Sequence, residues 1–198
     1  MRVLVACEYS GRVREAFQGR GHDAWSCDLL HSEDMSLFHI RGPVQDVLAM
    51  GCWDLVIAHP PCTYLCNSGV SHLKKGENDH RMAQMRAAAE FFRIFLDCGA
   101  PRVCIENPVP HKYARERIGR PSQYVQPYMF GHPEQKKTGL WLKGLPNLDP
   151  THDVEAKMRR LPDNQRQRLH YLPPGPDRWK ERSRTYQGIA DAMASQWG

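Results

Sequence analysis

The stretch R-V-L-V-A-C-E-Y-S-G-R-V-R-E-A-F, residues 2–17, decides the fold. Its first part, R-V-L-V-A-C, is a short apolar run, which is typical of a buried strand. A turn with a serine and a glycine follows, and V-R-E-A-F then has a helical pattern. A strand that passes through a turn into a helix is the first unit of a parallel α/β sheet.

The same alternation continues along the chain. The residues at 80–98 have apolar positions at helical spacing and good helix formers, and Gly99 and Pro101 end this helix. Strands are expected at 23–28, 53–58 and 102–106. The sequence therefore predicts an α/β fold with a mostly parallel sheet.

After residue 120 the pattern changes. Y-V-Q-P-Y-M-F and T-G-L-W-L predict two strands that form a hairpin around G-H-P-E-Q-K-K. Residues 143–182 are rich in Pro, Arg and polar side chains, which indicates an irregular loop or a small subdomain. The last stretch, Y-Q-G-I-A-D-A-M-A-S-Q-W, predicts a short helix.

Length and composition point to one globular domain of 198 residues. No apolar run approaches the roughly 20 residues that span a bilayer, and the first apolar run is too short for a signal peptide. We therefore expect a soluble cytoplasmic protein without a membrane partner. The seven cysteines form no C-x-x-C pair, so neither a disulfide framework nor a metal site is expected.

The net charge of +5 is concentrated in one segment. Between residues 151 and 184, nine Lys and Arg residues stand against five Asp and Glu residues. This excess permits nucleic acid as a partner, although a solvated surface would also explain it.

Residues with unusual chemistry follow the expected strands, where ligands bind in parallel sheets. The first turn, C-E-Y-S-G, matches neither G-x-G-x-x-G nor the P-loop, so a diphosphate ligand is not expected. Asp28 is placed to accept hydrogen bonds from ribose hydroxyls, and Asp46 to accept one from an amino group. Either acid alone could equally be a helix cap or a surface charge.

Two further turns carry a thiol and a carboxyl group. Cys62 follows a proline pair that fixes two φ angles, which suits a directed nucleophile, although a buried structural cysteine explains it as well. Glu106 ends the strand R-V-C-I and precedes N-P. In a half-buried pocket its carboxyl could stay protonated and hydrogen-bond a ring nitrogen and an amino group together, or it could belong to a capping turn.

Taken together, these motifs resemble the S-adenosylmethionine-dependent DNA cytosine-C5 methyltransferases, in a short form typical of phages and prophages. P-P-C (60–62) resembles the catalytic Pro-Cys motif, and E-N-P (106–108) resembles Glu-Asn-Val. E-Q-K-K-T-G (134–139) resembles Gln-x-Arg-x-Arg, and residues 182–197 are similar to the closing motif of the family. The resemblance implies a Rossmann-like class I methyltransferase sheet with a reduced target-recognition segment.

The resemblance also implies a mechanism. Cys62 attacks C6 of a flipped-out cytosine in DNA, Glu106 holds the base, and C5 takes the methyl group from S-adenosylmethionine. Asn107 and Lys137 complete the implied catalytic set, and Pro61 and Gln135 contact the substrate. The residues implied to bind the cofactor are Cys7, Glu8, Tyr9, Ser10, Gly11, Asp28, Asp46, Val47 and Pro60.

The chain departs from the family in three places. Glu8 takes a glycine position of the first motif, Gly139 replaces the second arginine of the third motif, and the recognition segment is short. We expect a catalytic domain at 1–142 and 183–198, and a small basic DNA-contacting segment at 143–182, with short or relaxed sequence recognition. The candidate contacts to the DNA backbone are Lys74, Lys75, Arg81, Arg159 and Arg160.

Other interpretations stay open. H-P-P-C-T-Y is similar to the motif of amino methyltransferases, although His59 and Cys62 are unusual in it. A C5 modification with another donor, an inactive DNA-binding protein of the same fold, and an RNA substrate are further alternatives. The oligomeric state is left open, with a monomer favoured.

Overall fold

The computed structural model describes residues 1–67 and 79–198. Within them, seven strands form one sheet in the order β3-β2-β1-β4-β5-β7-β6. The pairs from β3 to β5 are parallel, while β7 is antiparallel to both β5 and β6. The strands are β1 (Arg2–Ala6), β2 (Asp23–Asp28), β3 (His39–Arg41), β4 (Leu55–Ala58), β5 (Arg102–Pro108), β6 (Gln123–Val125) and β7 (Thr138–Lys143). The expected Rossmann-like α/β sheet with an antiparallel hairpin is therefore confirmed.

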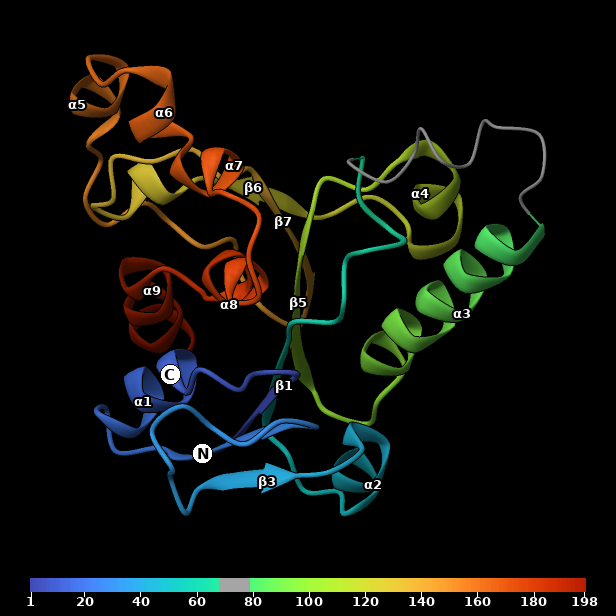
Figure 1. Ribbon diagram of the computed structural model, residues 1–198. Helices are drawn as coiled ribbons and strands as arrows, with labels where there is room; N and C mark the ends of the chain where they lie inside the picture. The colour runs from blue at the N-terminus through green and yellow to red at the C-terminus, as the bar shows by residue number, and fades with distance from the viewer. Residues whose placement is uncertain (68–78) are drawn as a thin grey trace.

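Helices cover both faces of the sheet (Figure 1). Along β1, Val3 and Val5 belong to one hydrophobic cluster and Leu4 and Ala6 to the other, because side chains alternate across a strand. The first cluster contains residues of α1 (Arg12–Gln18) and α9 (Gln187–Trp197), and the second contains residues of α2 (Val44–Ala49), α3 (Asp79–Leu96) and α4 (Lys112–Ile118). This two-sided burial explains why the central strands are continuous apolar runs.

Several short elements were not predicted. β3, α2 and α4 have too few residues to show a clear period. In the segment 143–182 the structure has short helices separated by turns. These are α5 (Glu155–Arg159), α6 (Asp163–Arg166) and α7 (Arg168–Tyr171), and α8 (Arg178–Ser183) follows at its end.

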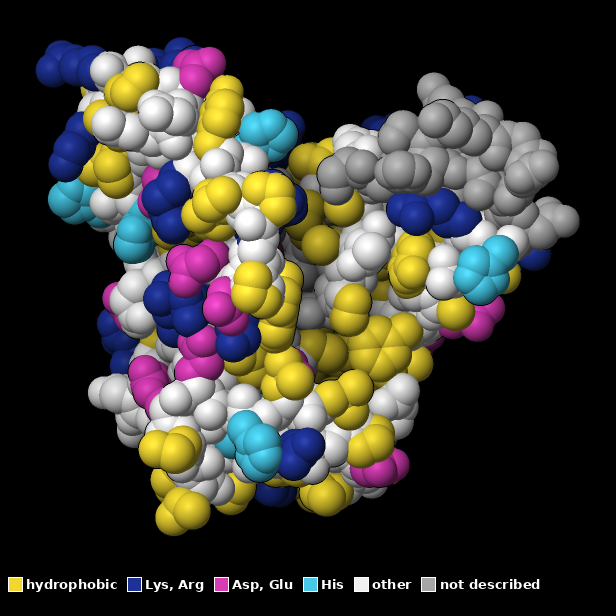
Figure 2. Space-filling model, viewed as in Figure 1, with side chains coloured by type: hydrophobic (Ala, Val, Ile, Leu, Met, Phe, Trp, Pro, Cys, Tyr) yellow, Lys and Arg dark blue, Asp and Glu magenta, His cyan; other side chains and the backbone are white. Residues whose placement is uncertain are grey.

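The molecule is hollowed at the edge of the sheet where the parallel strands end. Figure 2 shows the hollow between the tip formed by α5 and α6 and the side of the molecule that contains α3, with hydrophobic side chains along its floor. Lys and Arg side chains lie on the α5–α6 tip. The hollow is the place where a parallel α/β sheet binds its ligands.

None of the helices in the described ranges is long and apolar enough to cross a membrane.

Candidate active site

Two neighbouring strands bring a histidine and a glutamate together. The backbone N–H of His59, directly after β4, donates to the carbonyl of Ala6 (2.9 Å). Ala58 and Ile105 are register partners of β4 and β5, so the residues that follow them, His59 and Glu106, lie side by side. Nδ1 of His59 lies 2.7 Å from Oε2 of Glu106, and each side chain is only 10% exposed.

The charges of His59 and Glu106 depend on the groups that surround them. Burial alone would lower the pKa of His59, but the hydrogen bond and charge of Glu106 and the charge of Glu8 raise it. Burial alone would raise the pKa of Glu106, but the charge of Lys136 and the bond and charge of His59 lower it. An imidazolium beside a carboxylate is therefore the favoured state of this site. This differs from the protonated carboxyl considered for Glu106 from the sequence.

Four side chains form what we call the central charge cluster: Glu8, His59, Glu106 and Lys136. Glu8 comes from the turn after β1, and Lys136 from the loop before β7. Nζ of Lys136 donates to the carbonyl of Arg184 (3.4 Å). Sequence reasoning missed His59 and Lys136, because neither residue belongs to a motif position that carries chemistry in the family.

Two buried polar atoms near this cluster have no hydrogen-bond partner in the described part of the chain: Nε2 of His59 and Oδ1 of Asn107. Three other buried atoms in that part of the chain are also unpaired, namely Arg14 Nε, Trp141 Nε1 and Arg166 Nε, so it is the position of these two atoms on adjacent strand ends that suggests a ligand or water. Asn107 is otherwise well held, since its Nδ2 donates to the carbonyl of Pro60 (2.8 Å).

Cys62 begins a tight turn beside the cluster. Its carbonyl accepts hydrogen bonds from the backbone N–H groups of Leu65 and Cys66, both at 3.0 Å. A hydrogen bond to the Cys66 thiol, followed by burial and the charges of Cys66 and Glu106, raises the pKa of Cys62 well above its ordinary value. The thiol is therefore protonated in this state, whereas a cysteine that attacks as a nucleophile must become a thiolate.

Glu8 has a structural contact in the first turn. Its carboxylate accepts hydrogen bonds from the backbone N–H groups of Val13 (2.8 Å) and Arg14 (3.3 Å) and thereby caps α1. Gly11 has φ +74°, and a Cβ there would meet the guanidinium of Arg14. Because Glu8 occupies the backbone N–H groups that would otherwise bind a phosphate, this turn offers them to no phosphate group of a ligand.

The acids expected at the cofactor lie near one another. Asp28, at the end of β2, accepts a hydrogen bond from the backbone of Leu30 (2.9 Å). Burial and then the charges of Asp28 and Asp46 raise the pKa of Cys27 to about 11, so both carboxylates lie close to this thiol. Burial and then the charge of Asp28 raise the pKa of Cys7. Two carboxylates beside the ends of β1 and β2 fit hydroxyl and amino groups of a nucleoside.

The other expected cofactor residues differ in their surroundings. Val47 is buried, and its carbonyl accepts a hydrogen bond from the indole of Trp53 (3.1 Å). Ser10 Oγ lies 3.4 Å from the Glu8 carboxylate. The hydroxyl of Tyr9 donates to the carbonyl of Lys180 (3.0 Å), and its ring packs on Trp179 with centroids 5.4 Å apart. Tyr9 therefore joins the first turn to α8.

The third motif is placed differently from the expectation. Lys137 is exposed, with Nζ 4.5 Å from the centre of the Tyr124 ring, while the preceding residue, Lys136, acts on Glu106. A Cβ on Gly139 would lie 3.0 Å from side-chain atoms of Pro121 and Trp141, so this position has no room for an arginine. The backbone N–H of Gln135 donates to the carbonyl of Arg166 (2.6 Å).

The expected DNA contacts are spread over the molecule. Arg159 and Arg160 are exposed on and after α5, and Arg159 pairs with Glu155 (2.5 Å). The guanidinium of Arg81 lies 5.2 Å from the centre of the Tyr64 ring. Lys74 and Lys75 lie outside the described residues. Pro61 is exposed and Pro60 is buried.

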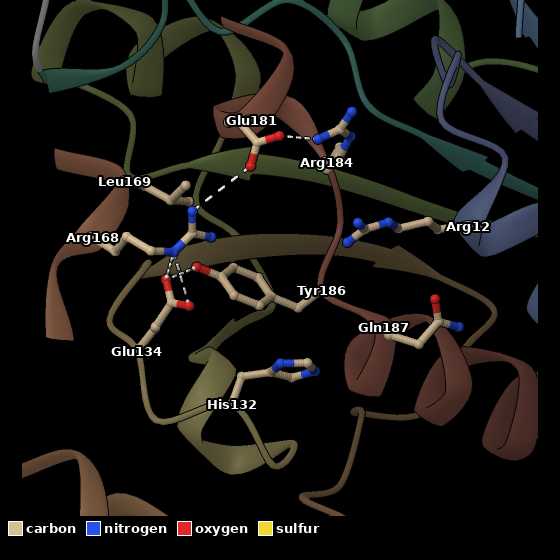
Figure 3. Close-up of a pocket in the computed structure, with 9 residues that line it drawn as sticks. All are labelled: Arg12, His132, Glu134, Arg168, Leu169, Glu181, Arg184, Tyr186 and Gln187. Atoms are coloured by element: carbon tan, nitrogen blue, oxygen red, sulfur yellow. Dashed lines mark hydrogen bonds and ion pairs between the residues drawn. The ribbon is translucent and has the colours of Figure 1, made fainter. Parts of the chain in front are cut away.

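A second cluster of charges surrounds a cavity of about 370 Å³ (Figure 3). Arg168 lies 3.2 Å from Glu134, which also accepts a hydrogen bond from the hydroxyl of Tyr186 (2.8 Å). Glu181 pairs with Arg168 (3.7 Å) and with Arg184. Nε2 of His132, which lines the same cavity, accepts a hydrogen bond from the backbone of Gly188 (3.0 Å) and so holds the start of α9.

No group of three or more potential metal ligands occurs within the residues that the structure places.

Comparisons with known proteins show a distant likeness in structure. No family model and no curated protein matches the sequence. The chain is similar to an E. coli protein named as a DNA modification methyltransferase encoded within a prophage, with 15% identity, a TM-score of 0.48, and 82% of this chain and 56% of that chain covered. It is also similar to WbdD in a complex with a kinase inhibitor, with 16% identity, a TM-score of 0.40, and coverage of 72% and 35%.

A triple mutant of Spodoptera frugiperda DNMT2 has 13% identity, a TM-score of 0.37, and coverage of 77% and 54%. The chain thus spans about half of the length of two of these proteins and about a third of the other.

Proposed function

We propose that this protein transfers a methyl group from S-adenosylmethionine to C5 of cytosine in DNA, with Cys62 as the nucleophile. The observation that carries the proposal is the 2.8 Å hydrogen bond from Asn107 to the carbonyl of Pro60. It clamps the P-P-C turn against the E-N-P turn, so the thiol and the carboxyl lie at one place. The charge of Glu106 acts on the Cys62 thiol, which supports this closeness.

The residues divide the chemistry between them. Cys62 gives its proton to water as the base binds, and its sulfur forms a bond to C6 while the C5=C6 electron pair shifts to C4–C5 and the C4=N3 pair shifts to N3. Glu106 donates a proton to N3 and accepts a hydrogen bond from the 4-amino group, which stabilises the charge of the ring. C5 then uses the shifted electron pair to bond the methyl group, and N3 returns its proton to Glu106. A base removes the C5 proton, and the electron pair of that bond restores C5=C6 as the bond between sulfur and C6 breaks and the sulfur leaves as a thiolate.

The cofactor supplies an electrophilic methyl group when it is bound. Asp28 and Asp46 would hold its ribose and amino groups, and the turn from Cys7 to Gly11 would lie against the rest of it. Glu8 stabilises this turn, because its carboxylate caps α1 and keeps this helix in place. A thermal-shift titration of the wild type with S-adenosylmethionine measures this binding without any activity, and Asp28→Ala is expected to weaken it.

Methyl transfer from labelled S-adenosylmethionine to mixed-sequence DNA tests the reaction. The wild type is expected to label C5 of cytosine, Cys62→Ser to give no label, and Cys98→Ser to behave as the wild type, since Cys98 lies just beyond α3. Label that persists in Cys62→Ser, or label on N4, contradicts the proposed nucleophile.

DNA binding by the segment 143–182 is a separate part of the proposal. Arg159 and Arg160 are exposed on the basic α5–α6 tip beside the hollow, where DNA phosphates would be within reach (Figure 2). Arg159→Ala with Arg160→Ala is expected to weaken DNA binding, and to reduce the slope of log affinity against log salt by about 2 if each residue neutralises one phosphate. An unchanged affinity removes these two residues from the proposed surface.

The second candidate is a DNA-binding protein of the same fold without catalytic activity. The raised pKa of Cys62 favours it, because hydrogen bonding to Cys66, burial and nearby negative charge keep the thiol protonated. DNA binding without methyl label and without a thermal shift by S-adenosylmethionine is the result expected for this candidate.

A further inference from the structure

We propose that His59 is a positioning residue that fixes the orientation of Glu106 and leaves Oε1 as the oxygen that meets the base; this inference rests on the proposed function. The cytosine ring needs a proton at N3 and an acceptor for its 4-amino group. A glutamate can supply both only if its carboxyl group is held in one orientation and one protonation pattern.

The backbone places His59 for this role. Its N–H is bonded to the carbonyl of Ala6 in β1, and the two prolines after it restrict the chain. Ala58 and Ile105 pair in register, so His59 and Glu106 project from neighbouring positions of the sheet. The 2.7 Å bond between them is therefore set by two parallel strands rather than by a flexible loop.

The bond uses only one oxygen of the carboxyl group. Nδ1 of His59 donates to Oε2, and Oε1 has no hydrogen-bond partner in residues 1–67 and 79–198. The cavity that Glu106 lines with Lys136 and Tyr186 has a volume of only about 10 Å³ and is too small for a base, so the base must meet the carboxyl group from outside it. A base beside Glu106 would meet Oε1 as the oxygen that His59 leaves unused, while the second lone pair of Oε2 stays available for the amino group.

The pair can hold one mobile proton without breaking its bond. In the empty site this proton is on Nε2 of His59, which is buried and has no acceptor among the described residues. When cytosine binds, Nε2 gives its proton to water and Oε1 takes one from water, so the charge of the pair is unchanged. Nδ1–H stays bonded to Oε2 in both states.

The charges around His59 act on this balance from several elements. Glu8 faces it from the turn after β1, Glu106 from β5, and Lys136 from the loop before β7. Cys62 lies three residues after His59 in the same loop, and the charges of Glu106 and Lys136 also shift the pKa of its thiol. A proton on Glu106 neutralises the carboxylate whose charge raises the pKa of the Cys62 thiol, although the net charge of the pair is unchanged, and this favours the thiolate that attacks C6.

Three substitutions separate positioning from simple support of the fold. In His59→Asn, the amide nitrogen lies the same number of bonds from Cα as Nδ1 and can donate to Oε2. In His59→Gln, it corresponds instead to Nε2, and His59→Leu keeps no donor. We expect His59→Leu to lower kcat about 100-fold with an unchanged KM for DNA, and His59→Asn to recover most of this loss. His59→Gln is expected to resemble His59→Leu.

The pH profile gives a further distinction. In the wild type, kcat/KM is expected to fall as His59 loses its proton, and in His59→Asn this alkaline limb moves to lower pH because Glu106 must hold the proton alone. Two results overturn the inference: wild-type kcat and pH profile in His59→Leu, or no recovery in His59→Asn. If the wild type itself transfers no methyl group, the proposed function fails, and this inference fails with it.

A measurement on the unsubstituted protein covers the case in which the variants do not fold. Nitrogen NMR of labelled histidine is expected to show His59 with a proton on Nδ1 throughout the titration, and a lower His59 pKa in Glu106→Gln. An Nε2–H tautomer with a bare Nδ1 overturns the inference.

Discussion

The central charge cluster and the cavity of Figure 3 are both built from acidic and basic side chains. They differ in whether the polar atoms of these side chains have hydrogen-bond or ion-pair partners. Around the cavity, Glu134 has two side-chain partners and Glu181 has two arginines. Beside the cluster, Nε2 of His59 and Oδ1 of Asn107 are buried without partners in the described part of the chain.

This difference separates a structural network from a site. Charges that satisfy one another, as at the cavity, hold α7 and α8 against the start of α9. Buried groups that lack partners raise the free energy of the folded protein by roughly 1–3 kcal/mol each, so they persist where a ligand satisfies them. Figure 2 shows acidic and basic side chains intermixed over α8, as expected for a self-satisfied surface.

The same substitution in both regions gives the sharpest test of this contrast. Glu106→Gln removes the group that donates to N3, and we expect methyl transfer to fall by roughly 10³-fold. Glu134→Gln removes a charge that is satisfied by Arg168 and Tyr186, and methyl transfer is expected to stay within a few-fold of the wild type. Initial rates at saturating DNA measure both, and equal losses would abolish the distinction.

A neighbouring pair of lysines tests how local the site is. Lys136 acts on Glu106 and Cys62, whereas Lys137 lies over Tyr124. Lys136→Met is expected to reduce kcat by roughly 100-fold, because the charge that lowers the pKa of the Cys62 thiol is lost. Lys137→Met is expected to have a much smaller effect. A larger loss of kcat in Lys137→Met than in Lys136→Met would instead assign the catalytic role to Lys137, the residue that the motif indicated.

The rate at which Cys62 is alkylated tests the surroundings of its thiol without any enzymatic turnover. The hydrogen bond to Cys66 is the largest contribution that raises the pKa of Cys62. Cys66→Ala is therefore expected to lower this pKa and to make alkylation of Cys62 by iodoacetamide several-fold faster at pH 8. Peptide mapping identifies the modified residue, and Cys98→Ser is the control. A slower reaction of Cys62 would show that Cys66 assists the thiolate instead.

The sequence predicted the sheet well because its strands are short apolar runs at regular spacing. It also indicated Cys62 and Glu106, since P-P-C and E-N-P are local motifs. It could not identify Lys136, because the two adjacent lysines in the loop before β7 differ only in the direction in which their side chains point. Nor could it show that Glu8 caps α1 or that His59 meets Glu106, since the latter contact joins residues 47 positions apart.

The smallest expected effects concern stability, and they distinguish the two regions by their dependence on pH. The raised pKa of His59 means that its contribution to stability is complete below about pH 6.5, its ordinary pKa. This contribution is lost as the pH rises through the raised value. His59→Asn lacks this contribution, so its unfolding curve is expected to approach that of the wild type at alkaline pH.

Tyr186→Phe removes the hydrogen bond to Glu134 at the cavity and is expected to lower the free energy of unfolding by about 1 kcal/mol. Burial, together with the hydrogen bond and charge of Glu134, raises the pKa of Tyr186, so the hydroxyl keeps its proton between pH 5 and 8. The loss should therefore be the same across this range, and urea unfolding at several pH values measures it. The loss of unfolding free energy in Tyr186→Phe could instead change with pH, as it does in His59→Asn. That result would mean that the cavity network also holds a proton that a ligand could move.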